Sequence, residues 1–163
     1  MQPRAYVAPA DGRLTESQVA KYVAFLQNRE RPAGSRAEPE GDSRGDRDSE
    51  AARSLGIHPD EIRWIGRTVL DTRIRLEERE AEKRNLETYR ATLASLRKAL
   101  DASTDPPTRS MISRQIAELE RESGEVERSL RRPSEKALAS NEALVLRYRV
   151  DLDSARRALP VAR

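Results

Sequence analysis

The 163-residue chain contains no cysteine, one histidine, one tryptophan and one phenylalanine. The absence of cysteine excludes disulfides, thiolate metal sites and cysteine nucleophiles. With His58 as the one imidazole, the chain lacks the histidine pairs that hold metals or share acid–base work. No apolar run approaches the ~18 residues that a membrane-spanning helix needs. We therefore expect no metal, no cofactor and no transmembrane segment.

Bulky apolar residues are also scarce, since Leu, Ile, Val and Phe make up about 19 % of the chain. Such a share is typical of disorder when the net charge is high. Here 31 basic and 28 acidic side chains leave a net charge of only +3. Ala, Glu, Lys, Leu and Arg account for about half of the residues, as in long helices and coiled coils. This composition predicts an all-α protein with narrow apolar seams.

The N-terminal third divides into three parts. Residues 1–13 contain two prolines and a glycine, which predict a flexible N-terminus. Residues 14–30 are predicted to form the first helix, because Thr15 and Gln18 match a capping box and apolar residues follow at helical spacing. Residues 31–50 have no apolar side chain larger than Ala and predict a disordered linker.

Residues 51–160 are predicted to form a helical hairpin and a bundle. After a short helical turn that stops at Gly56, a long helix begins at Pro59 and meets no further proline before Pro106. The segment Asp101–Pro107 is a turn. A third helix then runs to about residue 133, and a fourth runs from about residue 134 to 160.

The two helices on either side of the turn share one register. Residues that face each other across an antiparallel hairpin have a constant sum of their sequence numbers. Four apolar pairs give a sum of 212, and Tyr89 faces the small Ser123 at the same sum. These pairs are Leu100 with Ile112, Leu96 with Ile116, Leu93 with Leu119, and Leu86 with Val126. The pattern predicts a long antiparallel coiled-coil arm.

The fourth helix should lie beside the first half of the long helix. Two helices cannot cover all of the apolar residues there, so we predict that the first helix completes a three-helix bundle. Leu70 is expected under that first helix, and the alternative is an exposed Leu70 that binds a partner. Trp64 lies in the stripe of core residues but could instead anchor a partner. We name Trp64, Leu70 and Ile74 as candidate partner-binding residues.

The C-terminal third is the most basic part of the chain. Arg128, Arg131 and Arg132 complete the set of candidate partner-binding residues. Acidic residues are interleaved with these arginines, whereas a nucleic-acid interface needs a one-sided basic stripe or aromatic platforms. The pattern therefore argues against nucleic-acid binding.

Two segments carry a resemblance. GIHPDEIRWIGRTVLDTR and NEALVLRYRVDLDSARR, on either side of a charged hairpin, resemble a loose class of small, uncharacterised helical bacterial proteins. Members of this class are often exported or lipid-anchored, and the resemblance implies no activity and no catalytic residues. The expected location is cytoplasmic by default, or the cell envelope if the sequence is a mature form whose leader was removed.

No phosphate-binding loop, catalytic triad or metal-ligand spacing is present in the sequence. We therefore expect a protein that is not an enzyme and has no small-molecule substrate. The leading hypothesis is a structural or adaptor protein that acts through helix-mediated binding to another protein or to itself. The alternatives are a holdase-type chaperone whose arm clasps unfolded clients, and a nucleic-acid-binding protein.

The register makes one direct prediction. The double variant Leu93→Cys with Leu119→Cys should form a disulfide readily under mild oxidation, because facing seam residues come within disulfide reach. The double variant Leu93→Cys with Val126→Cys should not. Non-reducing electrophoresis measures the difference, and preferential crosslinking of the second pair would show that the register is wrong.

Overall fold

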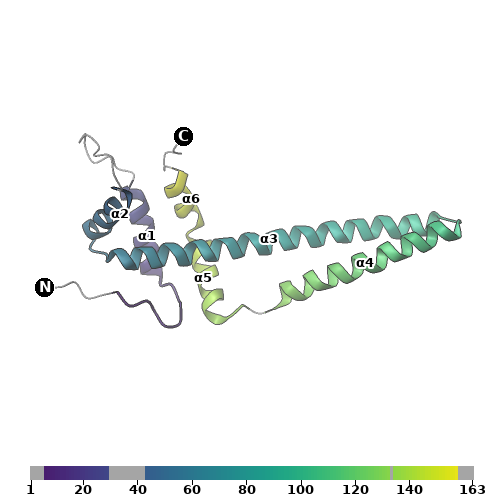
Figure 1. The fold of residues 1–163 in the computed structure, drawn as a ribbon, viewed down its shortest axis with the longest axis horizontal. Coiled ribbons are helices and arrows are strands. Elements are labelled where there is room, and N and C mark those ends of the chain that lie inside the picture. Colours follow the sequence, from purple (N-terminus) through teal and green to yellow (C-terminus); the bar gives the residue numbers. More distant parts are fainter. Residues whose placement is uncertain (1–5, 30–42, 133, 158–163) are drawn as a thin grey trace. The chain divides into compact units, whose positions relative to one another are not determined.

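The computed structural model describes residues 6–29, 43–132 and 134–157, and every regular element in those ranges is a helix (Figure 1). The helices are α1 (Glu16–Arg29), α2 (Ser43–Ser54), α3 (Pro59–Ala102), α4 (Pro106–Arg131), α5 (Lys136–Arg147) and α6 (Arg149–Arg157). The all-α prediction is therefore confirmed. The chain divides into two compact units, one of Met1–Arg73 with Ser134–Arg163 and one of Ile74–Pro133.

The second unit is a hairpin of α4 and the C-terminal part of α3, which run antiparallel (Figure 1). Asp105 caps α4, because its Oδ2 accepts hydrogen bonds from the Thr108 hydroxyl at 2.5 Å and the Thr108 N–H at 3.0 Å. These two bonds lower the pKa of the Asp105 carboxyl. The Arg109 guanidinium donates to the carbonyls of Leu100 at 2.7 Å and Ser103 at 2.8 Å, so it caps the end of α3. The turn is therefore fixed from both helices.

The predicted seam residues are all buried or half-buried along the hairpin. Leu86, Leu93 and Ile112 are each 7 % exposed. The others are half-buried, namely Tyr89, Leu96, Leu100, Ile116, Leu119, Ser123, Val126 and Leu130. A two-helix hairpin covers each helix from one side only, so its seam cannot reach the burial of a globular core.

Two ion pairs across the hairpin agree with the predicted register. Arg90 Nη2 lies 2.7 Å from Glu127 Oε1, and Arg97 Nη2 lies 2.7 Å from Glu120 Oε1. In each pair the arginine lies four residues after a seam leucine of α3. The glutamate lies one residue after the α4 seam residue that faces that leucine. These positions flank the seam of an antiparallel coiled coil, so the ion pairs repeat one heptad apart.

Polar residues replace leucine in the seam near the end of α4. Arg79 Nη2 lies 3.5 Å from the carbonyl oxygen of Leu130, and the Ser129 hydroxyl donates to the Glu82 carboxylate at 3.3 Å. Both α3 residues are half-buried and lie where the heptad pattern would otherwise place apolar side chains. The interruption of the apolar stripe over residues 77–85 therefore corresponds to polar contacts with the last turn of α4.

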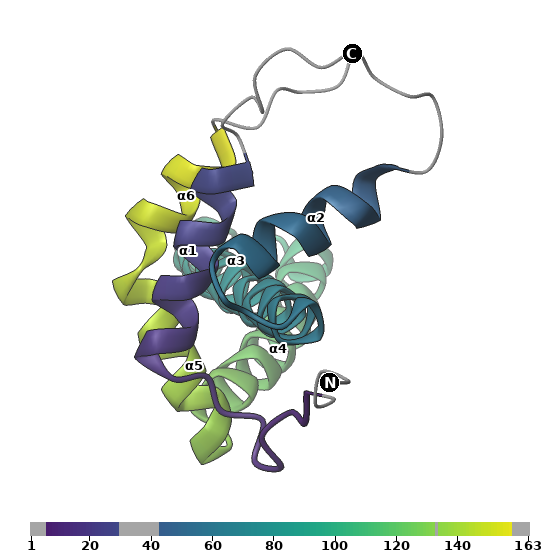
Figure 2. The same cartoon turned by 90° about the vertical axis from the view of Figure 1, so that its left-hand side faces the viewer.

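The first unit has a core built from five helical segments rather than the three that were predicted. Its helical buried apolar residues come from α1, α2, the start of α3, α5 and α6: Val19, Val23, Phe25, Leu26, Ala52, Ile62, Ile65, Val69, Val145, Leu152 and Ala155. Leu14 and Ile57 join them from the segments before α1 and α3. Helix α1 lies alongside α5 and α6 (Figure 2). The prediction of a three-helix bundle captured α1, α3 and the C-terminal helical region, but it missed α2 and the division of that last region.

Helix α2 corrects the prediction of a disordered linker over residues 31–50. Residues 43–50 belong to α2, while residues 30–42 lie outside the described part of the chain. Ala52 is fully buried and packs α2 into the first unit. Alanine is too small and too common for its position to indicate a buried helix from the sequence. The predicted stop at Gly56 is confirmed: its φ is 68°, and Ile57 N–H bonds Ala52 C=O at 2.9 Å in a Schellman arrangement.

Helices α5 and α6 correct the prediction of one continuous fourth helix. Tyr148 separates them with φ −91° and ψ 10°. Arg147 Nη1 and the Tyr148 hydroxyl lie 3.2 and 3.3 Å from Glu16 Oε1 at the start of α1. Burial and the nearby Glu16 charge raise the pKa of Tyr148. Because the break contains neither glycine nor proline, the sequence offered no signal for it.

The flexible N-terminus predicted over residues 1–13 stays a prediction, and its residues 1–5 lie outside the described part of the chain, but the end of this segment is tied to the first unit. Leu14 is 3 % exposed, and its N–H donates to Asn141 Oδ1 at 2.8 Å. Asn141 Nδ2 in turn donates to the Gly12 carbonyl at 3.0 Å. Asn141 is 2 % exposed, so its amide satisfies two backbone groups inside the protein.

Asn141→Ala should lower the free energy of unfolding by about 2–4 kcal/mol, because it leaves the Leu14 N–H and the Gly12 carbonyl without their buried partner. Urea denaturation followed by far-UV circular dichroism measures the loss. Asn85→Ala is the matched control, since Asn85 is exposed on α3 and its replacement should change stability by less than about 0.5 kcal/mol. Equal effects of the two substitutions would contradict the structural role of Asn141.

Candidate protein-interaction surface

The face of α3 that α1 covers is defined by Gly66. A Cβ atom at Gly66 would lie 3.1 Å from the Tyr22 hydroxyl oxygen and 3.2 and 3.3 Å from two ring carbons. The Tyr22 ring therefore rests against the backbone of α3, and a larger residue at position 66 would require the ring to move by a few tenths of an ångström. Ile62, Ile65 and Val69 flank this position and are at most 5 % exposed.

Leu70 does not belong to this covered face, so the prediction that the first helix buries it is wrong. Leu70 is 42 % exposed, and Ile74, one turn further along α3, is 45 % exposed. Successive residues of a helix point about 100° apart, so the buried Val69 directs Leu70 away from the core. The alternative that was kept open, an exposed Leu70, is the one that the structure shows.

Trp64 is half-buried and is partly covered by the N-terminal segment. The centroids of the Tyr6 and Trp64 rings lie 6.2 Å apart, with an interplanar angle of 47°. This is a tilted aromatic pair of ordinary geometry. Trp64 is therefore neither a core residue nor a freely exposed anchor.

The three predicted arginines lie at the end of α4, in the other unit. Arg128, Arg131 and Arg132 are all exposed. Arg128 Nε donates to the Gly124 carbonyl at 3.1 Å, and Arg131 Nη2 lies 3.5 Å from Glu127 Oε2. Glu127 also binds Arg90, and that hydrogen bond lowers the pKa of its carboxyl. The arginines thus neighbour a glutamate and do not form an uninterrupted basic stripe.

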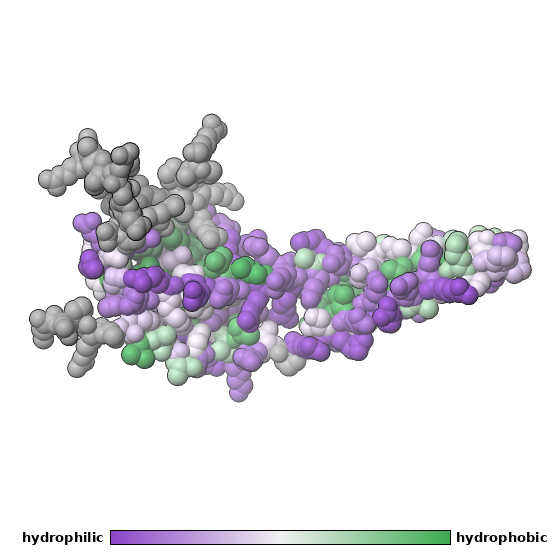
Figure 3. All heavy atoms as spheres, in the orientation of Figure 1, coloured by the Kyte–Doolittle hydropathy of each residue, from purple (hydrophilic) through white to green (hydrophobic). Residues whose placement is uncertain are grey.

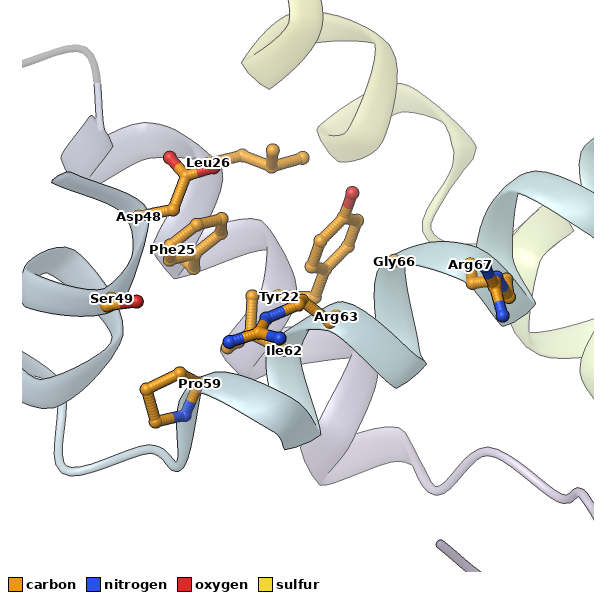
Figure 4. Close-up of a pocket in the computed structure, with 10 residues that line it drawn as sticks. All are labelled: Tyr22, Phe25, Leu26, Asp48, Ser49, Pro59, Ile62, Arg63, Gly66 and Arg67. Carbon is orange, nitrogen blue, oxygen red and sulfur yellow. The ribbon is translucent and has the colours of Figure 1, made fainter. Parts of the chain in front are cut away.

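A cleft of about 610 Å³ lies between α1, α2 and the start of α3 (Figure 4). Tyr22 and Phe25 from α1 stack at 6.2 Å with an angle of 19° and line it together with Ile62. Arg63 and Arg67 contribute guanidinium groups, and Arg63 Nη1 lies 3.2 Å from Asp60 Oδ1 outside the cleft. The lining offers apolar and cationic groups together with the Asp48 carboxylate and Ser49.

Two exposed apolar residues were missed as surface features. Leu146 is 51 % exposed and Val150 is 76 % exposed, on either side of the break at Tyr148. Between these two positions and the end of α6, Leu152 occupies the core at 1 % exposure. Tyr6 and Asn141 were also missed as contacts of the N-terminal segment, since only tertiary structure brings them to their partners.

Charged side chains dominate the face of the molecule in Figure 3, where apolar residues form small separate patches. Within the described ranges, no group of three or more His, Asp or Glu side chains is placed to hold a metal ion. His58 Nδ1 instead accepts the Asp60 N–H at 3.2 Å at the start of α3. None of the helices described between residues 6 and 157 has both the length and the apolarity of a membrane span.

Comparison with known proteins found no matching family model, no matching curated protein and no matching solved structure.

The contact at Gly66 yields a prediction. Gly66→Ala should destabilise the protein, although alanine normally favours a helix interior by about 1 kcal/mol, because the added Cβ meets the Tyr22 ring. In a Tyr22→Ala background the same substitution should be stabilising. Gly124→Ala is the control, since a Cβ there meets no atom within 4 Å and should add about 1 kcal/mol of stability. Urea melts of these variants give the coupling free energy between positions 22 and 66. Equal effects of alanine at Gly66 and Gly124 would contradict the contact between Tyr22 and the α3 backbone.

Proposed function

We propose that the protein is a non-catalytic structural or adaptor protein that binds another protein, or a second copy of itself, through exposed helical side chains. One observation supports this most directly: Leu70 and Ile74, one turn apart on α3, are both exposed. The helix around them is otherwise polar on its exposed side, with Arg67, Asp71 and Arg75 as exposed neighbours. An apolar centre with a polar rim is the usual arrangement of a protein-binding surface.

The expected energies are modest. Burial of a whole leucine or isoleucine side chain contributes about 1.5–3 kcal/mol. Because each side chain is nearly half exposed, a partner that covers it would gain about 1 kcal/mol per residue. Two such residues give a weak contact by themselves, so the proposed interface needs further contacts from its rim.

The exposed arginines of α4 support a partner with acidic groups. Arg128, Arg131 and Arg132 lie at the end of that helix, where they can make contacts that orient a partner and depend on salt. In this proposal they act as a second contact region and contribute more to association rate than to affinity.

The test combines Leu70→Gln with Ile74→Gln. The free energy of unfolding should change by less than about 1 kcal/mol, because neither side chain is part of the core. Complexes of the parent chain are captured by chemical crosslinking in cells followed by affinity purification. Their amount should fall about tenfold or more in the variant, which corresponds to a loss of about 1.4 kcal/mol or more of binding free energy. Sedimentation of the purified protein shows whether the partner is a second copy.

Met111→Gln is the matched control, because Met111 is 55 % exposed and belongs to α4 rather than to α3. It should leave the complexes unchanged. Complexes that persist in the Leu70 and Ile74 variant, or that fall equally with Met111→Gln, would remove this surface from the proposal. Suppression of client aggregation by the parent chain would instead favour a holdase.

A further inference from the structure

The N-terminal segment is held very unequally at its two ends. At Leu14 it is fixed by a buried side chain and by the two hydrogen bonds with Asn141. The Gly12 N–H also bonds the Pro9 carbonyl at 3.0 Å, which closes a turn. Between this turn and Tyr6 the side chains of Val7 and Ala8 are exposed. The end near residue 6 therefore depends on Tyr6 itself.

Tyr6 contributes one favourable and one unfavourable contact. Its ring lies against Trp64, which is favourable. Its hydroxyl oxygen is buried, and among the described residues it has no partner within hydrogen-bonding distance. Burial, with a smaller effect of the Glu61 charge, raises the pKa of the Tyr6 hydroxyl, and the Gln18 side chain acts in the opposite direction. An unsatisfied buried hydroxyl costs free energy that solvation in the open position would recover.

We propose that residues 6–9 form a latch over Trp64, which opens and closes while Asn141 keeps the segment attached at Leu14. The closed position gains the aromatic contact and loses the hydration of the Tyr6 hydroxyl. Because these two effects oppose each other, the closed and open positions are close in free energy. Opening exposes Trp64, and a large aromatic side chain is a typical anchor for a protein partner.

Removal of the Tyr6 hydroxyl tests the proposal, because it should favour the closed position, in which the Tyr6 ring lies against Trp64. Tyr6→Phe keeps the ring against Trp64 and eliminates the buried polar group. Tyr6→Ala removes both contacts. The parent chain should therefore be more open than Tyr6→Phe and more closed than Tyr6→Ala.

Trp64 is the single tryptophan of the chain, so its fluorescence reports the latch directly. Acrylamide quenching of the full-length protein should decrease in Tyr6→Phe, with the open population falling about fivefold or more. Quenching should increase in Tyr6→Ala. Val7→Ala is the control, since Val7 is 84 % exposed and its replacement should leave quenching unchanged. Far-UV circular dichroism should be the same for all four proteins.

Two results would overturn the latch. If quenching in Tyr6→Phe equals that of the parent chain, the hydroxyl does not oppose closure. If quenching in Tyr6→Ala also equals it, Tyr6 does not cover Trp64. The latch is independent of the surface formed by Leu70 and Ile74, so either proposal can fail without the other.

Discussion

The buried amide of Asn141 is the contact on which the arrangement of the first unit depends. It accepts from the Leu14 N–H and donates to the Gly12 carbonyl, and so fixes the chain just before α1 begins. Glu16, two residues later, reaches Arg147 and Tyr148 at the break between α5 and α6. With its start held in this way, α1 packs alongside α5 and α6 and presents Tyr22 to Gly66 of α3. A polar side chain thus gives specificity to a core that has few bulky residues.

The hairpin shows how a thin seam can be specific. The seam contains few leucines, but the ion pairs beside it recur at a spacing of seven residues. Side chains also cap the end of α3 and the start of α4 at the turn. Exposed ion pairs contribute little stability individually. Their value here is geometric, because a shift of the helices by one turn would separate both pairs at once.

The sequence predicted what depends on local periodicity and missed what depends on distant contacts. The register of the hairpin follows from the sequence, because the heptad spacing of the apolar residues and the length of the turn decide which residues face each other. The position of residues 6–14 was not predictable, because Asn141 lies 127 positions away from Leu14. Leu70 was expected under the first helix and is exposed instead, because the burial of α3 depends on the direction in which Tyr22 approaches that helix. Nothing in a one-dimensional pattern specifies that direction.

The separation of contacts along the chain sets an order for folding. The Arg109–Leu100 bond at the hairpin turn spans nine residues, whereas Arg79 and Leu130 are 51 apart. Short loops close with less loss of entropy, so the hairpin can pair progressively from its turn. Leu14 must wait for Asn141, which the ribosome adds 127 residues later. During synthesis residues 12–14 therefore emerge long before the side chain that holds them in their native position.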